Sequence, residues 1–160
     1  MTEATKPDLV GLLDHVVQVG LVVEDLDALM AGMRQVFGLE PDSLFEAAFA
    51  NTVYRGEVVD TPARIANYDR FGVQLEFIQP LGDTSIWNDF LNEASHNGHR
   101  LHHVRFADAD DNDVITALMR ERGVEVYQEA FSFVNPGGKA TYYDTVGQLG
   151  FIAEVVTKRR

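Results

Sequence analysis

The spacing of hydrophobic and polar residues changes twice near the start of the chain. Leu12–Val23 is rich in β-branched residues and predicts a strand, whereas Asp25–Phe37 has apolar residues three and four positions apart, as an amphipathic helix does. Gly38 follows directly, and glycine is the residue most often found just after a helix end. The first part of the chain therefore predicts a strand followed by a helix.

The second half of the chain repeats this pattern. Leu101–Ala107 predicts a strand, and a helical pattern follows from Asp110 or Asp111. Gly123 then stands where that helix is expected to end. Asp25 precedes Gly38 by thirteen positions, and Asp110 precedes Gly123 by the same number. Internal repetition of this kind indicates a duplicated structural unit.

Further strand-like segments separated by turns follow each predicted helix. These segments lie around Leu44–Tyr54, Ala63–Tyr68 and Gly72–Gln79 in the first half, and around Val124–Ala130, Ala140–Tyr143 and Leu149–Val156 in the second. Each half is therefore predicted to be a β-α-β-β-β module, which gives an α+β fold class. We expect one domain over residues 12–160, with modules at about 12–80 and 100–157, after an N-terminal tail at 1–11.

A short polar connector joins the two predicted modules. The turn Pro80–Ser85 ends in hydroxyl side chains that can cap a short helix from Ile86 to Leu91. Three histidines follow at intervals of three positions, namely His96, His99 and His102. Because an Asn-Gly pair among them favours a turn over a helix, we expect these histidines on the surface, with a minor role in a lid or in substrate contact.

Composition and charge narrow the classes of function. The chain has 160 residues, 46% of them hydrophobic and 24% charged, as one globular domain does. Its formal net charge of −12 argues against nucleic acid and anionic membranes as partners, because like charges repel. No apolar stretch approaches the roughly 20 residues needed to cross a bilayer, and no signal peptide pattern is present, so we expect a cytoplasmic protein. The absence of cysteine excludes disulfides and thiolate metal ligands.

Four predicted strands each place one polar residue on the face opposite their apolar one, because side chains alternate along a strand. Gln18 and His103 stand at equivalent positions before the two helices, and Glu76 and Glu154 each lie in the last strand of a module. Two carboxylates, an imidazole and an amide oxygen are costly to bury unpaired, and a divalent cation removes that cost. We expect zinc, nickel, cobalt, manganese or iron(II) there, bound by nitrogen and oxygen alone.

Alternatives remain open for the residues around this predicted site. Each candidate ligand alone is also compatible with an ordinary solvated or ion-paired side chain, and His15 is an alternative ligand to Gln18, although strand alternation places it on the helix side. Arg105 shares the face of His103 and can bind a substrate carboxylate or phosphate, or pair with an acidic residue. The glycine-rich loop Asn135–Lys139 suits closure over a ligand, or is simply a turn.

These segments resemble the vicinal oxygen chelate superfamily, which includes glyoxalases, bleomycin resistance proteins and dioxygenases. The resemblance is carried by Val17–Asp25, Phe37–Leu39, Val73–Gly82, Leu101–Phe106 and Gly150–Val155. Members of this superfamily pair two βαβββ modules into an open mixed-sheet barrel around a divalent metal. By position, the resemblance implies that Gln18, Glu76, His103 and Glu154 are the metal ligands.

Within the superfamily, the turn Pro80–Gly82 and the pair His102–His103 look most like the methylmalonyl-CoA epimerases. That resemblance implies an isomerase that moves a proton next to a carbonyl through an enediolate, with Glu154 or Glu76 as the base. It also implies a small-molecule substrate such as an acyl-CoA or a keto acid, with Arg105 holding an acid group of that substrate.

The superfamily implies two other functions as well. The ligand order Gln, Glu, His, Glu is similar to that of glyoxalase I, a lyase, although Val22 and Pro80 stand where that enzyme has glutathione contacts. A non-enzymatic protein that binds a small molecule, for resistance or sensing, would bind it in the same concave site of the sheet.

Exposed edge strands and a duplicated module also lead us to expect a homodimer.

Overall fold

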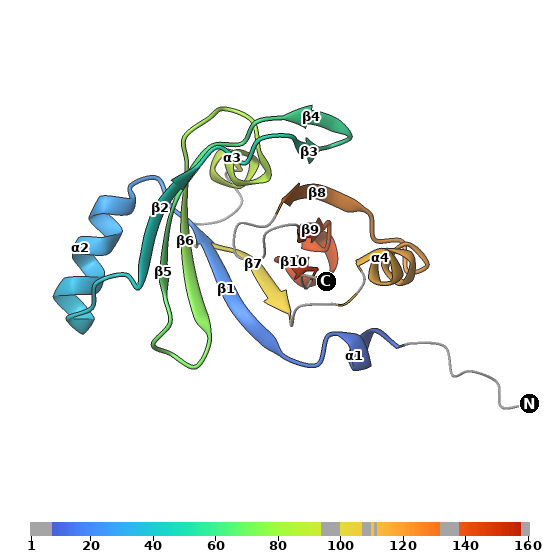
Figure 1. Cartoon of the computed structure of the whole chain (residues 1–160), viewed down its shortest axis with the longest axis horizontal. Coiled ribbons are helices and arrows are strands. Elements are labelled where there is room, and N and C mark those ends of the chain that lie inside the picture. Colours follow the sequence, from blue (N-terminus) through green and yellow to red (C-terminus); the bar gives the residue numbers. More distant parts are fainter. Residues whose placement is uncertain (1–7, 94–99, 107–109, 111, 132–137, 158–160) are drawn as a thin grey trace, which may run out of the picture.

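The computed structural model describes residues 8–93, 100–106, 110, 112–131 and 138–157. Within these residues ten strands form one mixed sheet in the order β2-β5-β6-β1-β7-β10-β9-β8-β3-β4. The sheet curls into an open half-barrel, with α2 and α4 on its outer side (Figure 1). No helix in this described part of the chain is long and apolar enough to cross a membrane. The predicted α+β class with two β-α-β-β-β modules is confirmed.

The elements of the first module and the connector are α1 (Leu9–Leu12), β1 (Val16–Val22), α2 (Leu26–Phe37), β2 (Ser43–Ala47), β3 (Thr52–Tyr54), β4 (Glu57–Val59), β5 (Ala63–Tyr68), β6 (Gln74–Pro80) and α3 (Ile86–Asn92). The second module contains β7 (Leu101–Phe106), α4 (Asn112–Arg120), β8 (Val126–Phe131), β9 (Lys139–Tyr143), α5 (Val146–Leu149) and β10 (Ile152–Val156). The short helices α1 and α5 were not predicted, and each overlaps a predicted strand by one residue, Leu12 and Leu149. The apolar pattern alone does not separate one helical turn from an extended segment.

The predicted helix ends of the first module are the observed ones. The Asp25 carboxylate caps α2 by accepting a hydrogen bond of 2.9 Å from the backbone N–H of Ala28. Gly38 follows the helix at φ 67°, in the left-handed region that glycine adopts without steric cost. In the connector, the Ser85 hydroxyl caps α3 by accepting from the backbone N–H of Asn88 at 3.1 Å. Local capping chemistry therefore sets these boundaries.

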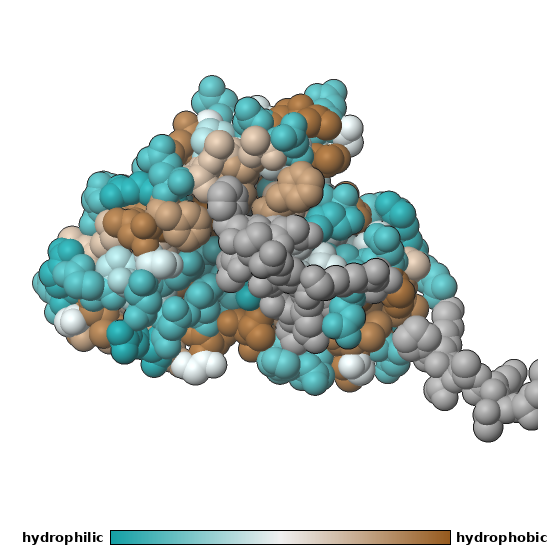
Figure 2. Space-filling view, in the orientation of Figure 1, coloured by the Kyte–Doolittle hydropathy of each residue, from teal (hydrophilic) through white to brown (hydrophobic). Residues whose placement is uncertain are grey.

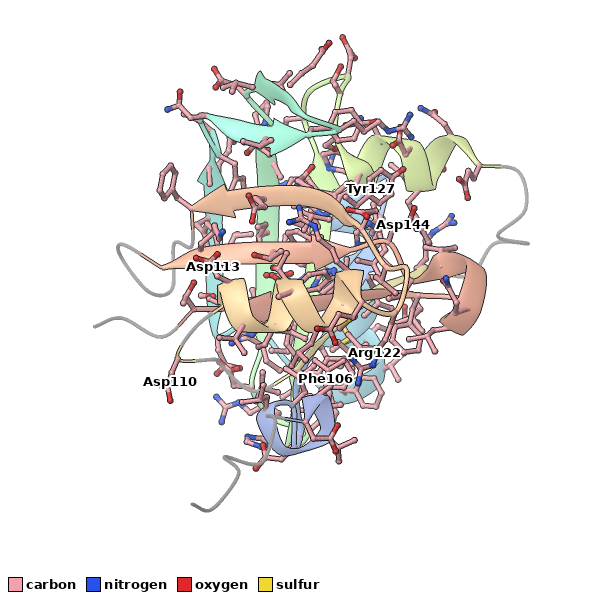
Figure 3. All side chains as sticks on the ribbon, turned by 90° about the vertical axis from the view of Figure 1, so that its right-hand side faces the viewer. Phe106, Asp110, Asp113, Arg122, Tyr127 and Asp144 are labelled. Carbon is pink, nitrogen blue, oxygen red and sulfur yellow. The ribbon has the colours of Figure 1, made fainter. Side chains whose placement is uncertain are left out.

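Four central strands join the two modules. β1 runs parallel to β6 and antiparallel to β7, and β7 runs parallel to β10. The face of each strand that points outward packs under a helix, α2 over the first module and α4 over the second, as Figure 3 shows for α4. The outer residues of β10, Ala153 and Val155, belong to the cluster under α4, whereas Ile152 and Val156 face inward. The predicted alternation of faces is confirmed.

The segment predicted as one strand over Leu44–Tyr54 is two strands, so this prediction was wrong. β2 pairs with β5 at one edge of the sheet, and β3 pairs with β8 of the other module. Between them Phe49 and Asn51 adopt φ 42° and 58°, which interrupts the extended backbone. The β3–β4 hairpin thus crosses from the first module to the second. Figure 2 shows hydrophobic surface over this hairpin, where Val53 and Val58 are exposed.

Asp89 of α3 fixes this crossing hairpin. Its Oδ2 accepts hydrogen bonds from the Tyr54 hydroxyl at 2.6 Å, the Tyr127 hydroxyl at 2.8 Å and Arg55 Nη2 at 2.9 Å. The Arg55 guanidinium lies 5.3 and 5.4 Å from the centres of the two tyrosine rings, within reach of cation–π attraction. We call these four residues the Asp89 cluster. It connects the hairpin, the connector helix and β8.

Candidate active site

A cup opens on the concave side of the sheet, with an empty volume of about 500 Å³ including its open mouth. Its polar lining residues are Gln18, Glu76, Arg105, Tyr142 and Glu154. They come from β1, β6, β7, β9 and β10, so both modules contribute to one site. The remaining nine lining residues are apolar.

His103 is fully buried beside this polar lining and contacts three oxygen atoms through one ring nitrogen. Its Nε2 lies 3.2 Å from Glu154 Oε2, 3.3 Å from Glu76 Oε2 and 3.4 Å from Gln18 Oε1. The structure therefore brings together, within hydrogen-bond distance of one atom, the four residues that strand alternation singled out.

Gly20 makes room for the His103 ring. On β1 it is the cross-strand partner of Glu76 on one side and of His103 on the other. A Cβ atom at this position would lie 1.9 Å from Cε1 of the His103 ring, far inside van der Waals contact. The two neighbouring strands can therefore direct a carboxylate and an imidazole to the same point only because this residue has no side chain.

A chain of amides orients Gln18. Gln18 Nε2 donates a hydrogen bond of 2.5 Å to Gln74 Oε1, and Gln74 Nε2 donates one of 2.8 Å to Asp69 Oδ1. Because its nitrogen is engaged by Gln74, Gln18 presents its oxygen to His103. The orientation is the one that a cation ligand requires, since only the amide oxygen can bind a metal.

The charges of this group are strongly coupled. Burial by itself lowers the pKa of His103, but the charge of Glu154 and hydrogen bonds to Glu154 and Glu76 raise it to about 9. Burial likewise acts to raise the pKa of Glu154, and the His103 charge and hydrogen bond, then Arg105 and Tyr142, lower it overall. At neutral pH the protein without a metal therefore holds a buried imidazolium beside an ionised carboxylate.

Tyr142 belongs to the site, although the sequence reasoning missed it. It stands opposite Glu154 in the β9–β10 register, and its hydroxyl hydrogen bonds to Glu154. Burial, then the charges of Glu154 and Glu76, raise its pKa well above 10, so the hydroxyl stays protonated. The available signal was strand alternation, which places the neighbour of Glu154 on the adjacent strand in the same cup.

The donor set fits a divalent cation. His103 Nε2 carries one hydrogen at most, yet three oxygens lie within 3.4 Å of it, so it cannot satisfy them all. Glu154 Oε2 is buried without a hydrogen bond of acceptable geometry among the described residues. In the side-chain positions of the described residues, no group of three or more His, Cys, Asp or Glu residues is arranged so that it could hold a metal ion. A cation would satisfy every one of these donor atoms.

Arg105 lies where it was predicted, in the lining of the cup. It is the cross-strand partner of both Gln18 and Glu154. His15 is exposed and pairs with Asp14, with 2.5 Å between His15 Nδ1 and Asp14 Oδ1, so it does not reach the cup. Of these two candidate ligands, only Gln18 therefore lies in the cup.

His102 is buried, so its predicted place on the surface was wrong. It lies on β7, where its ring meets Phe90 of α3 edge-on at 5.3 Å, and its Nδ1 lies 3.0 Å from His103 Nδ1. The turn signal of the connector does not extend as far as this strand. His96, His99 and residues 135–137 of the predicted glycine-rich loop lie outside the described residues.

The amino-acid sequence matches the model of one protein family. The model of the glyoxalase/bleomycin resistance protein/dioxygenase superfamily matches residues 17–142, which include three of the four candidate ligands. No curated protein matches the chain as a relative.

Solved structures match over nearly the whole chain at low identity. A methylmalonyl-CoA epimerase variant of Streptomyces coelicolor, in complex with 2-nitronate-propionyl-CoA, is 22% identical with a TM-score of 0.57, covering 90% of this chain and 94% of that one. The methylmalonyl-CoA epimerase of Mycobacterium tuberculosis is 15% identical, with a TM-score of 0.62 and coverage of 99% and 94%. A hypothetical protein of Bacillus halodurans is 14% identical, with a TM-score of 0.67 and coverage of 91% and 95%. At these identities the likeness shows the fold.

Proposed function

We propose that this chain, which belongs to the glyoxalase/bleomycin resistance protein/dioxygenase superfamily, is a metal-dependent isomerase that moves a proton next to a carbonyl of a small acyl thioester or keto acid. The observation that carries the proposal is the convergence of Gln18, Glu76 and Glu154 on one nitrogen of His103. Matching structures described as complexes with 2-nitronate-propionyl-CoA and with methylmalonyl-CoA support an acyl-CoA as the first substrate to test.

Gln18, Glu76, His103 and Glu154 would hold the divalent cation by one nitrogen and three oxygens. When bound there, the cation would supply a Lewis acid for the substrate carbonyl oxygen. Its identity is left open among zinc, nickel, cobalt, manganese and iron(II), because all of them accept imidazole and carboxylate ligands.

Glu154 and Glu76 are the proposed bases. They approach His103 from β10 and β6, on either side of the central pair β1 and β7. A substrate carbon held between them would meet a carboxylate on each face, so one can remove the proton while the other returns a proton from the opposite side. This arrangement suits inversion at a carbon next to a carbonyl.

Arg105 is the proposed binding residue for an acid group of the substrate. Its guanidinium can form two parallel hydrogen bonds with a carboxylate, and it is the only Lys or Arg residue among the described residues that line the cup. Its position beside Glu154 in the sheet would place that acid group next to the reacting carbon.

The test is exchange of the α-proton of methylmalonyl-CoA in deuterated water, followed by NMR with the protein loaded with each metal in turn. We expect Glu154→Gln to lower the exchange rate by about 100-fold or more, because a positioned general base contributes roughly 10²- to 10⁴-fold. Glu125→Gln, at an exposed position outside the cup, is the matched control. Absence of exchange with every metal, or full exchange in Glu154→Gln, would contradict the proposal.

A small-molecule binding protein is the second candidate function, favoured by the nine apolar residues in the cup lining. Metal analysis separates the two candidates. An isomerase of the proposed kind retains a divalent ion or gains thermal stability when one is added, whereas a pure binder does neither.

Turnover of a glutathione hemithioacetal tests the lyase alternative. Light scattering after size-exclusion chromatography tests the expected homodimer.

A further inference from the structure

We propose that the cup contains a preformed apolar subsite, the aromatic wall of Phe45, Phe49 and Trp87, which selects organic acids carrying an aryl or branched alkyl group over those carrying only a methyl group. The inference rests on the proposed function only for the polar residues of the cup, which receive the acid group. The aromatic wall itself concerns the part of the ligand that does not react.

The aromatic wall is assembled from three separate parts of the first module and the connector. Phe45 comes from β2, Phe49 from the turn that follows it, and Trp87 from α3, and all three line the cup. Ile65 of β5 and Ile78 of β6 add apolar surface from the sheet itself. The lining of the cup therefore combines polar side chains with this apolar surface, and small-molecule sites of that composition orient amphipathic ligands.

The backbone of Phe49 is held in an uncommon conformation. Its φ of 42° lies in the left-handed region, which residues with a Cβ atom rarely adopt. Its carbonyl oxygen accepts hydrogen bonds from the Thr52 hydroxyl at 2.7 Å and from the Thr61 backbone N–H at 3.4 Å. The two threonine hydroxyls also hydrogen bond to each other at 3.0 Å, in a fully buried position. Such strain persists only where the surroundings impose it, and it is commonest at functional sites.

This buried network determines where the Phe49 ring lies. The ring meets Trp87 edge-on, with 5.4 Å between centres and 64° between planes. Because the backbone is fixed, the wall does not have to be ordered when a ligand binds, and that saving in entropy favours binding. Aromatic faces and edges of this kind pack well against flat rings and branched alkyl groups, whereas a methyl group leaves most of the wall uncovered.

The test compares two ligands with the same head group, methylmalonate and benzylmalonate, by isothermal titration calorimetry with and without added Zn²⁺. We expect benzylmalonate to bind about tenfold more tightly, from the extra apolar surface removed from water. Trp87 is the single tryptophan of the chain, so a change in its fluorescence on binding reports contact with the wall. Equal affinities, or no detectable binding of either ligand, would overturn the proposal.

Variants locate the preference on the wall. Phe49→Ala is expected to bring the affinity ratio close to one while changing methylmalonate affinity by less than about twofold. Thr52→Val leaves the Phe49 ring in place and keeps the volume of residue 52, but it removes the hydroxyl that donates to the Phe49 carbonyl. It is therefore expected to lower the affinity ratio to a value between those of the wild type and Phe49→Ala. Phe37→Ala, an exposed aromatic at the end of α2, is the control and is expected to leave the ratio unchanged.

The outcomes separate this inference from the proposed function. If Phe49→Ala fails to fold, Thr52→Val and Phe49→Leu provide the same comparison at smaller structural cost. A ratio that survives in both Phe49→Leu and Thr52→Val overturns the aromatic wall. Benzylmalonate and methylmalonate share a head group, so the ratio of their affinities does not depend on whether the protein catalyses proton exchange. The isomerase proposal can therefore fail while the aromatic wall is retained.

Discussion

The centre of the sheet and the junction formed by the crossing hairpin are held together in different ways. In the centre, strand register places one candidate ligand on each of β6, β1, β7 and β10, and the modules repeat the same positions. At the junction, β3 has only the pairs Val53–Glu129 and Tyr54–Gln128 with β8, and the Asp89 cluster supplies the remaining connection. The polar residues of the cup thus lie on the repeated part of the sheet, while the junction depends on an irregular crossing.

This difference predicts separate consequences for changes in each region. We call Gln18, Glu76, His103 and Glu154 the ligand group. A change in the centre should disturb both the geometry of this group and the stability of the protein, because most of these side chains are buried in the sheet. A change at the junction should loosen the hairpin and leave the ligand group intact. The four predictions below test that separation.

Gly20→Ala is expected to have the largest effect. The new Cβ atom would overlap the ring of His103, which is enclosed on every side and must move. We expect a loss of about 3 kcal/mol or more in the free energy of unfolding, at the upper end for an overpacked core, and at least tenfold weaker metal binding. Chemical denaturation and metal titration measure both.

The matched control is Gly32→Ala, within α2, where an added Cβ atom meets no other atom within 4 Å. It is expected to stabilise the protein by up to about 1 kcal/mol, because alanine favours a helix more than glycine does. If Gly20→Ala behaves like Gly32→Ala, the close approach of β1 and His103 is not required.

The second prediction concerns the stability of the metal-free protein as pH changes. The pKa of His103 is raised from 6.5 to about 9 on folding, so the folded state binds more protons than the unfolded state between these values. Its contribution is complete below pH 6.5 and is lost as pH rises to about 9. Each pKa unit corresponds to about 1.4 kcal/mol, so the loss amounts to roughly 3 to 4 kcal/mol.

Glu154 acts in the opposite direction at low pH. Because its pKa is lowered on folding, its contribution is present above pH 4.5 and is lost as pH falls below that value. The metal-free protein should therefore be most stable between about pH 4.5 and 6.5. Urea unfolding in the presence of EDTA measures the profile. His103→Gln should flatten its alkaline limb, and an unchanged limb in that variant would refute the charged histidine.

The sequence predicted the centre far better than the junction. Alternation along single strands was enough to place Gln18, Glu76, His103 and Glu154 in one group, because register in a buried sheet leaves each side chain only two faces. Whether those four residues bind a metal is a separate question that the proton-exchange and metal experiments address.

The junction depends on contacts that no local pattern encodes. Phe49 enters the left-handed region without being glycine or asparagine, and a single asparagine two residues later was the only turn-favouring residue near the end of β2. Tyr54, Asp89 and Tyr127 are far apart in the sequence and meet only after both modules have formed. His102 was misplaced for a related reason, since its burial comes from α3, which packs over β7 from the connector.

Asp89→Ala is expected to have an intermediate effect, confined to the junction. Three donors lose their shared acceptor, one of them the Tyr54 hydroxyl, which burial and Asp89 keep protonated by raising its pKa to about 12. We expect a loss of about 2 kcal/mol, reduced because Asp89 is partly exposed. Hydrogen exchange should become faster in β3 and β4 but not in β1 and β7.

The exposed Asp83→Ala serves as the control for this prediction and should leave hydrogen exchange unchanged throughout. Faster exchange in β1 and β7 as well as in the hairpin would show that the centre and the junction unfold as one unit. In that case the rigid placement of the ligand group would depend on the Asp89 cluster too.

The smallest effect is expected for His15→Ala. The imidazole is 62% exposed and its partner Asp14 is 67% exposed, so their contact is largely screened by water. Removing it should change the free energy of unfolding by less than about 0.5 kcal/mol and metal affinity by less than about twofold. Gln18→Ala is the informative partner, because it deletes an oxygen that faces His103 from inside the cup. If His15→Ala weakens metal binding while Gln18→Ala does not, then β1 supplies its ligand from its exposed end, and the register that places the other three ligands has been assigned to the wrong face.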